Sequence, residues 1–200
     1  MAPDGPQLLG TGPLEETGPL KLRAFFGLPV PETRREPLAR YLEACASVAP
    51  EFRWVPPANL HLTVRFIGSV ERELVDGVAR NLGAARLHAF ELELGELETF
   101  KRGRLVRVVW MGLRSGAEEA SELAARVEVE CGRAGLVAEA RAFQPHLTLA
   151  RARNRDGASL PVLPEPPHVE PWLAQELVLY QSRLGRAGAV YEPLRVLRLD

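Results

Sequence analysis

The sequence predicts an α+β fold in which two lobes of antiparallel sheet, with helices outside, flank a cleft. Strand-like and helix-like segments alternate irregularly, with hairpins among them, which favours antiparallel sheets over a doubly wound parallel sheet. The order strand, helix, strand, helix recurs loosely in each half. The phrase Asn59-Leu60-His61-Leu62-Thr63-Val64 returns as Gln144-Pro145-His146-Leu147-Thr148-Leu149. We therefore expect an internal duplication whose two lobes are related by a pseudo-twofold axis, with the two phrases facing each other.

The composition is that of a globular protein. The chain has 200 residues, of which 46% are hydrophobic and 26% charged, enough for one compact domain or two small lobes sharing one site. Residues 1–19 contain four Gly and four Pro without any period, so we expect a disordered N-terminal tail there. Residues 20–200 are then expected to form a single bilobal domain. The net charge of −1 gives no argument for a nucleic-acid partner.

No membrane or targeting segment is visible, and the two cysteines are isolated. No apolar run is as long as a membrane span, and the N-terminus lacks a basic segment followed by an apolar one. Cys45 and Cys131 stand in helix-like stretches without a neighbouring Cys or His, which predicts buried apolar residues and neither a zinc site nor a disulfide. We expect a cytoplasmic monomer that does not contact a membrane.

The first half of the sequence reads as two strands, each followed by a helix. Pro29 and Pro31 close the first strand, and Pro31 can open the helix, which carries apolar residues at helical spacing. The elements expected here are a strand over 22–28, a helix over 32–48, an irregular connection over 50–57, a strand over 60–67 that ends at Gly68, and a helix over 70–83.

The second half repeats this plan with more hairpins. Alternating apolar and acidic residues mark a half-exposed strand at its start, and glycine-containing turns join the paired strands. The elements expected here are strands over 89–100 and 105–113 joined by a turn, a helix over 117–133, a short strand or extended lead-in over 137–143, a strand over 146–151, a proline-rich loop over 154–171, and a hairpin of 176–184 with 189–199.

The spacing within the repeated phrase matters only if both copies are strands. Side chains two positions apart in a strand point to the same face, so His61 and Thr63 project together, as do His146 and Thr148. The leucine between each His and Thr points into the core. Two His and two Thr would then face one cleft, which we take as the candidate active site.

Such a set of side chains suits acid–base chemistry on a phosphate. Neutral imidazole can take a proton and imidazolium can give one near neutral pH. A base and an acid on opposite sides of a phosphorus atom support in-line displacement without a metal ion, and threonine hydroxyls can donate to the non-bridging oxygens. The substrate this predicts is a phosphodiester with an alkoxide leaving group.

The chain resembles the 2H phosphoesterase superfamily and, within it, the RNA 2′,3′-cyclic phosphodiesterase family, also called the 2′-5′ RNA ligase family. Similarity runs from about residue 21 to the end. The segments that carry it are Arg23-Ala24-Phe25-Phe26 with Leu28-Pro29, Trp54-Val55-Pro56, Asn59 to Gly68, Phe143 to Arg151, and Ser182-Arg183-Leu184-Gly185 with Tyr191. The resemblance implies the bilobal α+β fold and metal-free hydrolysis of RNA or nucleoside 2′,3′-cyclic phosphates to 2′-phosphates, without a cofactor.

The resemblance also implies residue roles. His61 would be the proton donor and His146 the proton acceptor, with Thr63, Thr148 and Arg151 binding the substrate. Strand parity points Arg151 away from His146, so its role requires a bulge or the end of the strand. Phe66 stands at the position in the first copy that Arg151 holds in the second, so the cleft cannot be functionally symmetric.

Several alternatives stay open at this stage. Arg65 has the parity to follow His61 and Thr63, or it is a solvated rim residue. Phe25 or Phe26 could stack on a base, although a core position is the expected one. His88 and His168 have no Thr partner and are expected to be core residues. The chain could also be a 2′-5′ RNA ligase, act on another small cyclic phosphate, or bind RNA ends without turnover.

Overall fold

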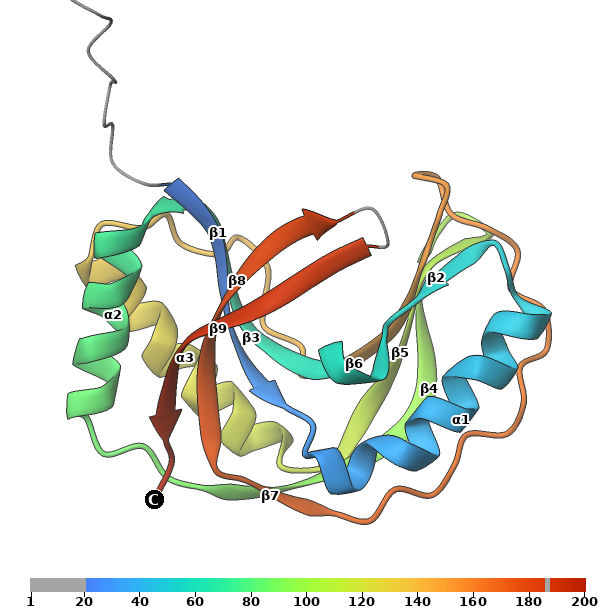
Figure 1. Cartoon of the computed structure of the whole chain (residues 1–200), viewed down its shortest axis with the longest axis horizontal. Coiled ribbons are helices and arrows are strands. Elements are labelled where there is room, and N and C mark those ends of the chain that lie inside the picture. Colours follow the sequence, from blue (N-terminus) through green and yellow to red (C-terminus); the bar gives the residue numbers. More distant parts are fainter. Residues whose placement is uncertain (1–20, 186–187) are drawn as a thin grey trace, which may run out of the picture.

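Nine antiparallel strands form one sheet in the part of the chain that the computed structural model describes, residues 21–185 and 188–200 (Figure 1). The expected tail over 1–19 and the tip of the last hairpin lie outside these residues. The strands are β1 (Lys21–Pro29), β2 (Phe52–Trp54), β3 (His61–Glu71), β4 (Phe90–Arg102), β5 (Leu105–Ser115), β6 (Leu147–Ala152), β7 (Trp172–Ala174), β8 (Glu176–Gly185) and β9 (Gly188–Arg198). The helices are α1 (Glu32–Val48), α2 (Arg72–Ala84) and α3 (Ala117–Arg133), with a 3₁₀ turn, η1, at Pro57–Asn59.

The sheet has a similar sequence of strands on either side of its centre, which lies between β6 and β3. The strand order is β7-β4-β5-β6-β3-β1-β8-β9, with β2 paired to β6, so β6-β5-β4 on one side corresponds to β3-β1-β8 on the other. The two sides meet where Leu62 of β3 pairs with Leu147 of β6. This arrangement confirms the antiparallel α+β fold and gives it the expected pseudo-twofold pattern, with each lobe drawing strands from both halves of the sequence.

The helices cross between the lobes. Helix α1 follows β1 but packs against β2 and η1, whereas α3 follows β5 but packs against β3 and α2. Figure 1 shows α1 on one outer side of the molecule and α2 with α3 on the other, with the sheet between them. Among the described residues, no helix is both long enough and apolar enough to cross a membrane.

Most element boundaries agree with the sequence to within two residues, whereas two short strands and the end of β3 do not. The helices over 32–48 and 117–133 begin and end as expected. The strands β2 and β7 were not predicted, because three residues are too few to show an alternating pattern. Strand β3 does not end at Gly68, which takes a φ of 84° and pairs with Ala24, so the strand continues to Glu71.

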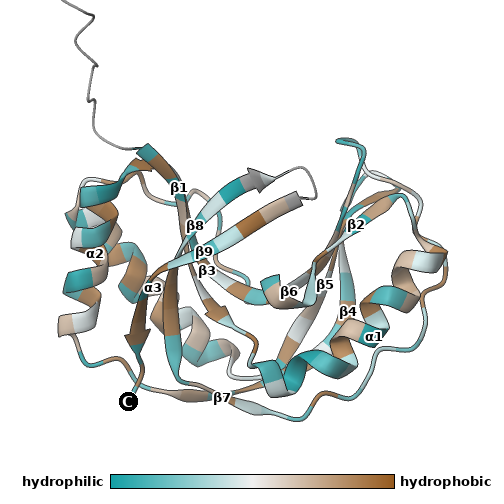
Figure 2. Ribbon diagram, in the orientation of Figure 1, coloured by the Kyte–Doolittle hydropathy of each residue, from teal (hydrophilic) through white to brown (hydrophobic). Residues whose placement is uncertain are grey.

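A core cluster of buried side chains runs through both lobes. It includes residues from all three helices, and Figure 2 shows each helix carrying both hydrophobic and hydrophilic residues. Phe25 and Phe26 belong to the core, with 3% and 0% of their surfaces exposed, as the sequence led us to expect. Cys45 and Cys131 are buried free thiols.

Candidate active site

The two copies of the repeated phrase meet at the centre of the sheet. Leu62 and Leu147, the residues between His and Thr, are antiparallel partners and are fully buried. Continuing that register by one residue places His61 opposite Thr148 and Thr63 opposite His146. Directly opposite residues of an antiparallel pair share a face, so the four polar side chains form one row on the face opposite the leucines.

Each copy is followed by a β-bulge at the same place. In β3, Phe26 pairs with Arg65 and Gly27 with Thr63, so Val64 is the extra residue. In β6, Val109 pairs with Ala150 and Trp110 with Thr148, so Leu149 is the extra residue. A bulge reverses the facing of every residue beyond it.

The second bulge resolves the parity problem at Arg151. Without it, Arg151 would face away from His146. With it, Arg151 lies on the cleft side and close enough to contribute to lowering the pKa of both histidines. The first bulge turns Phe66 outward in the same way, leaving 43% of its surface exposed. The guanidinium of Arg23 lies 5.1 Å from the centre of the Phe66 ring.

Both histidines are held in the same tautomer by the same kind of contact. The Nδ1 atoms of His61 and His146 lie 2.7 Å from the carbonyl oxygens of Asn59 and Gln144, each two residues before its histidine. A carbonyl only accepts, so Nδ1–H donates and each neutral ring keeps its lone pair on Nε2. The Thr63 hydroxyl lies 3.0 Å from Nε2 of His61 and can donate to it.

The surroundings of His61 favour its neutral form. Its ring packs against Phe25 at 4.8 Å and Tyr191 at 5.2 Å. A Cβ added to Gly27 would lie 3.1 Å from Cδ2 of His61, so the glycine makes room for the ring. The pKa of His61 is lowered to about 4, mainly by burial; the hydrogen bond to the Asn59 carbonyl opposes this, and the positive charges of Arg151 and His146 add to the lowering.

His146 lies in a second aromatic setting. Its ring meets Phe100 edge to face at 5.3 Å and Trp110 at 5.4 Å. Burial is again the main cause that lowers the pKa of His146 below 6.5; the hydrogen bond to the Gln144 carbonyl raises it in part, and the like charge of Arg151 lowers it. In the free protein near pH 7, both imidazoles are therefore neutral and able to accept a proton.

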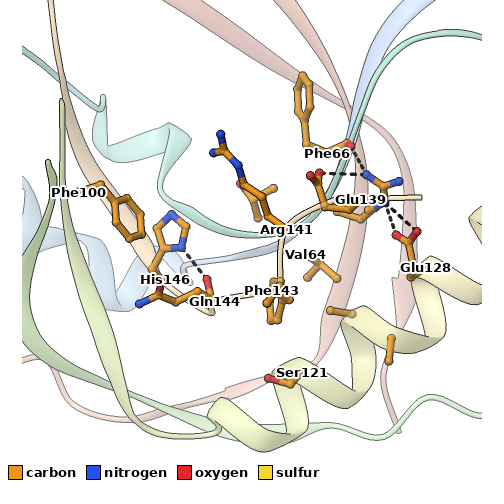
Figure 3. A pocket seen from close by; sticks show the side chains of 15 residues that line it. Val64, Phe66, Phe100, Ser121, Glu128, Glu139, Arg141, Phe143, Gln144 and His146 are labelled. Carbon is orange, nitrogen blue, oxygen red and sulfur yellow. Dashed lines mark hydrogen bonds and ion pairs between the residues drawn. The ribbon is translucent and has the colours of Figure 1, made fainter. Parts of the chain in front are cut away.

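Two pockets of different character flank the row of His and Thr side chains. The larger, about 580 Å³, has Thr63 and His146 in its wall together with Phe66, Phe100, Arg141 and Phe143. Figure 3 shows Arg141 between His146 and Phe66. The other pocket, about 300 Å³, is lined by Arg53, Asn59, Arg151, Arg153 and Tyr191.

Of the residues that line the two pockets, the sequence assigned only Thr63, His146 and Arg151 to the site. The sequence analysis noted Phe66 only because it holds the position in the first copy that Arg151 holds in the second. That correspondence was the one signal in the sequence that Phe66 faces the cleft. Arg141 and Phe143 lie in the irregular segment before β6, where no periodicity marks which side chains face the cleft.

Arg65 is neither a rim residue nor part of the catalytic row. Its side chain is 9% exposed and lies at the wall of the larger pocket. It donates to the Phe66 carbonyl at 2.8 Å and the Val137 carbonyl at 2.6 Å. It also forms ion pairs with Glu128 of α3 at 2.5 Å and Glu139 at 3.3 Å. Arg65 thus fastens the segment leading to His146 onto β3 and α3.

The other two histidines lie away from the row. The sequence led us to expect core residues, which was wrong, because His88 and His168 are both exposed. His88 lies in the connection between α2 and β4, and His168 lies in the proline-rich loop, where it contacts Glu170 at 3.1 Å; neither is in a strand. Among the described residues, no group of three His, Cys, Asp or Glu side chains is placed to hold a metal ion.

The chain is similar to known phosphoesterases over most of its length. The model of the LigT-like phosphoesterase family matches residues 28–110 and 112–191. An RNA 2′,3′-cyclic phosphodiesterase of Aeropyrum pernix is 35% identical over 162 residues, covering 78% of this chain and 92% of the relative. That of Escherichia coli is 30% identical over 174 residues, covering 86% and 94%. The crystal structure of E. coli LigT complexed with 3′-AMP matches with a TM-score of 0.71 at 27% identity, covering 90% of this chain and 99% of that one.

Proposed function

The chain belongs to the LigT-like phosphoesterase family, and from that premise we propose that it is an enzyme that hydrolyses 2′,3′-cyclic phosphodiester ends of RNA, or of nucleosides, to 2′-phosphomonoesters. The observation that carries the proposal is the single row of two His and two Thr side chains, in which each neutral imidazole keeps its lone pair on Nε2. Relatives named RNA 2′,3′-cyclic phosphodiesterase, and the 3′-AMP complex of the E. coli protein, support a nucleotide substrate.

The row can hold a cyclic phosphate between an acid and a base. The phosphorus would lie between the two Nε2 atoms, so that water attacks on one side while the ribose oxygen leaves on the other. Thr63 and Thr148 would donate to the non-bridging oxygens, and Arg151 would balance their charge. Because imidazoles supply the proton transfers, the step needs no metal ion or cofactor.

We assign His61 as proton donor and His146 as acceptor. A water proton passes to Nε2 of His146 as the new P–O bond forms, and Nε2 of His61 gives a proton to O3′ as the P–O3′ bond breaks. The low pKa of His61 in the free protein means that it must gain its proton in the complex. The phosphate anion favours this, because an opposite charge within a few ångströms raises the pKa of an imidazole.

The rest of the proposal concerns where the enzyme works. The five proposed site residues of one chain suffice for the proposed step, and we propose a monomer as the active unit. Two buried free thiols are compatible with a reducing cytoplasm.

Product analysis in the presence of EDTA tests the proposal. With a nucleoside 2′,3′-cyclic phosphate as substrate, we expect turnover that survives chelation, and phosphorus NMR should show the 2′-phosphate. Complete loss of activity with EDTA, restored by zinc or manganese, would refute the two-histidine mechanism. A 3′-phosphate product would refute the assigned donor while leaving the two-histidine chemistry standing.

Variants of the two histidines test the mechanism itself. We expect His61→Ala and His146→Ala each to lower kcat by about 10²–10⁴, the range for one general acid or base. The double variant should lose less than the product of the single losses, since the two act together in one step. His88→Ala, an exposed histidine far from the row, is the matched control. Near-normal activity in either single variant would rule out the mechanism.

A further inference from the structure

The smaller pocket is cationic and has no acidic residue among the described residues that line it. Arg53, Arg151 and Arg153 supply its charge, and Tyr191 is its only other titratable side chain. Arg53 of β2 and Arg151 of β6 are direct cross-strand partners, so two like charges stand on the same face of neighbouring strands. Desolvation lowers the pKa of Arg151, and Arg107 on β5, a fourth positive charge nearby, lowers it further.

This clustering of arginines lacks a counterion in the protein. Ten ion pairs are formed within residues 21–185 and 188–200, and none involves Arg53, Arg107 or Arg151. Directly opposed like charges destabilise a strand pair, so an anion that binds between them would relieve the repulsion. Arginine guanidinium groups suit phosphate because they can donate two hydrogen bonds in one plane.

The position of the pocket says which phosphate would reach it. Asn59 and Tyr191 connect it to His61: the Asn59 carbonyl accepts from His61, and the Tyr191 ring packs on the imidazole. In a ribose with a cyclic phosphate on O2′ and O3′, the base leaves from C1′ and the 5′ carbon from C4′, at opposite ends of the far edge. With the cyclic phosphate in the His and Thr row, the base and the 5′ carbon both leave the other face of the sugar and diverge toward opposite ends of the cleft.

The linings of the two flanking pockets match the two ends of the nucleotide, the base at one end and the 5′ side at the other. The larger pocket offers Phe66, Phe100 and Phe143, aromatic surfaces suited to a base. The smaller offers arginines, suited to a phosphate. We propose that the pocket between β2, β6 and β9 binds the phosphate on O5′ of the terminal nucleotide, with Arg53 as its ligand beside Arg151. The inference rests on the proposed function and makes the enzyme selective for strand ends over unphosphorylated nucleosides.

Three substrates separate the parts of this proposal. They are adenosine 2′,3′-cyclic phosphate without a 5′-phosphate, the same compound with a 5′-phosphate, and a dinucleotide with a 2′,3′-cyclic end. We expect kcat/KM to rise by about tenfold or more when a phosphate is present on O5′, as either a monoester or an internucleotide diester, which is the gain from one charge-assisted hydrogen bond. The gain is the kcat/KM of a substrate with a phosphate on O5′ divided by the kcat/KM of the first substrate. In Arg53→Gln this ratio should fall by about tenfold.

Salt dependence gives a second readout that does not depend on absolute activity. A lost phosphate contact should lower the slope of log(1/KM) against log[salt] for the dinucleotide by about 1 in Arg53→Gln. Arg80→Gln, an exposed arginine on α2, is the matched control and should keep the wild-type ratio and slope.

The activities on the three substrates distinguish an error in the proposed subsite from an error in the proposed function. If the wild type hydrolyses none of the three substrates, the proposed function is wrong. If it hydrolyses all three equally, or if the gain from the 5′-phosphate is unchanged in Arg53→Gln, the subsite is wrong and the function stands. If only the dinucleotide is favoured and Arg53→Gln keeps that preference, the pocket recognises the upstream nucleoside rather than its phosphate, which also overturns the proposal.

Discussion

At the scale of single residues, the sequence identifies which side chains carry the chemistry but says little of their state. The repeated spacing of His61 with Thr63 and His146 with Thr148 is informative because it places each pair on one face of a strand. The tautomer of each ring depends on the carbonyls of Asn59 and Gln144, and its pKa depends on aromatic rings and arginines that come from other strands. Those contacts exist only after folding.

The lowered pKa values predict an unusual pH profile. The mechanism needs one histidine charged and one neutral, whereas both are neutral near pH 7 in the free enzyme because burial lowers both pKa values. Lowering the pH adds one proton, which goes mainly to His146, and the active enzyme is the minor singly protonated form that carries this proton on His61. Because the total amount of singly protonated enzyme sets the rate, kcat/KM should rise below pH 7, peak between the two pKa values, and fall again below about 4, where both histidines are charged. In the complex, the phosphate anion raises both pKa values, so the maximum of kcat should lie at higher pH than that of kcat/KM.

Initial rates measured from about pH 4 to about pH 9, at constant ionic strength, check this prediction. The separation between the two maxima is the useful quantity, because it reports the effect of the bound phosphate on the histidines. A kcat/KM maximum above pH 7 would show that the free enzyme does not hold its histidines in the neutral form that their surroundings imply.

At the scale of elements, the sequence predicts the strands but not their irregularities. A bulge depends on how a strand pairs with its neighbour, so the extra residues Val64 and Leu149 cannot be recognised from the alternation of one strand alone. This is why the facing of Arg151 stayed unresolved in the sequence. The same limit applies to Arg65, whose ligands on α3 and at 137–139 lie far from it in the chain.

Arg65 predicts a link between stability and activity. In Arg65→Met the apolar stem is kept, but the carbonyls of Phe66 and Val137 lose their donor and Glu128 loses its partner. We expect the free energy of unfolding to fall by about 1–2 kcal/mol, since the hydrogen bonds of a buried guanidinium are lost while Glu128 and Val137 remain open to water. The segment 137–145 should loosen from β3, so His146 is positioned less well and kcat should fall more than KM changes.

Urea unfolding and steady-state kinetics at a temperature where the variant remains folded check both effects. Arg114→Met is the control, because Arg114 forms an exposed ion pair with Glu93 at 3.0 Å and should cost no more than about 1 kcal/mol. If Arg65→Met were as stable and as active as this control, Arg65 would not fasten the segment that precedes His146.

At the scale of the whole molecule, total charge conceals how charge is distributed. The net charge of −1 gave no sign of a polyanionic substrate, yet the fold brings Arg53, Arg107 and Arg151 from three strands to one side of the cleft. Only the strand order could reveal this, because these arginines are far apart in the sequence. The acidic residues that balance them lie elsewhere, including the exposed faces of the helices.

The exchange of helices between the lobes predicts that both unfold together. Helix α1 leaves β1 in one lobe to cover β2 in the other, α3 does the reverse, and one core cluster runs through both. All three tryptophans, Trp54, Trp110 and Trp172, lie on β2, β5 and β7 in one lobe, whereas α2 packs in the other. Tryptophan fluorescence therefore samples one lobe, whereas far-ultraviolet circular dichroism samples the helices of both lobes.

We expect urea unfolding curves from the two probes to coincide, with a single midpoint and a single slope, since coincident transitions are the mark of two-state unfolding. Lobes that were stable separately would give a fluorescence midpoint distinct from that of the helical signal. Such a result would mean that the junction at Leu62 and Leu147 can open while each lobe stays folded. The catalytic row would then be lost before the fold, because it takes one His and one Thr from each side of that junction. A single transition would instead tie the integrity of the row to global stability, so that loss of activity and loss of structure should follow the same curve in urea.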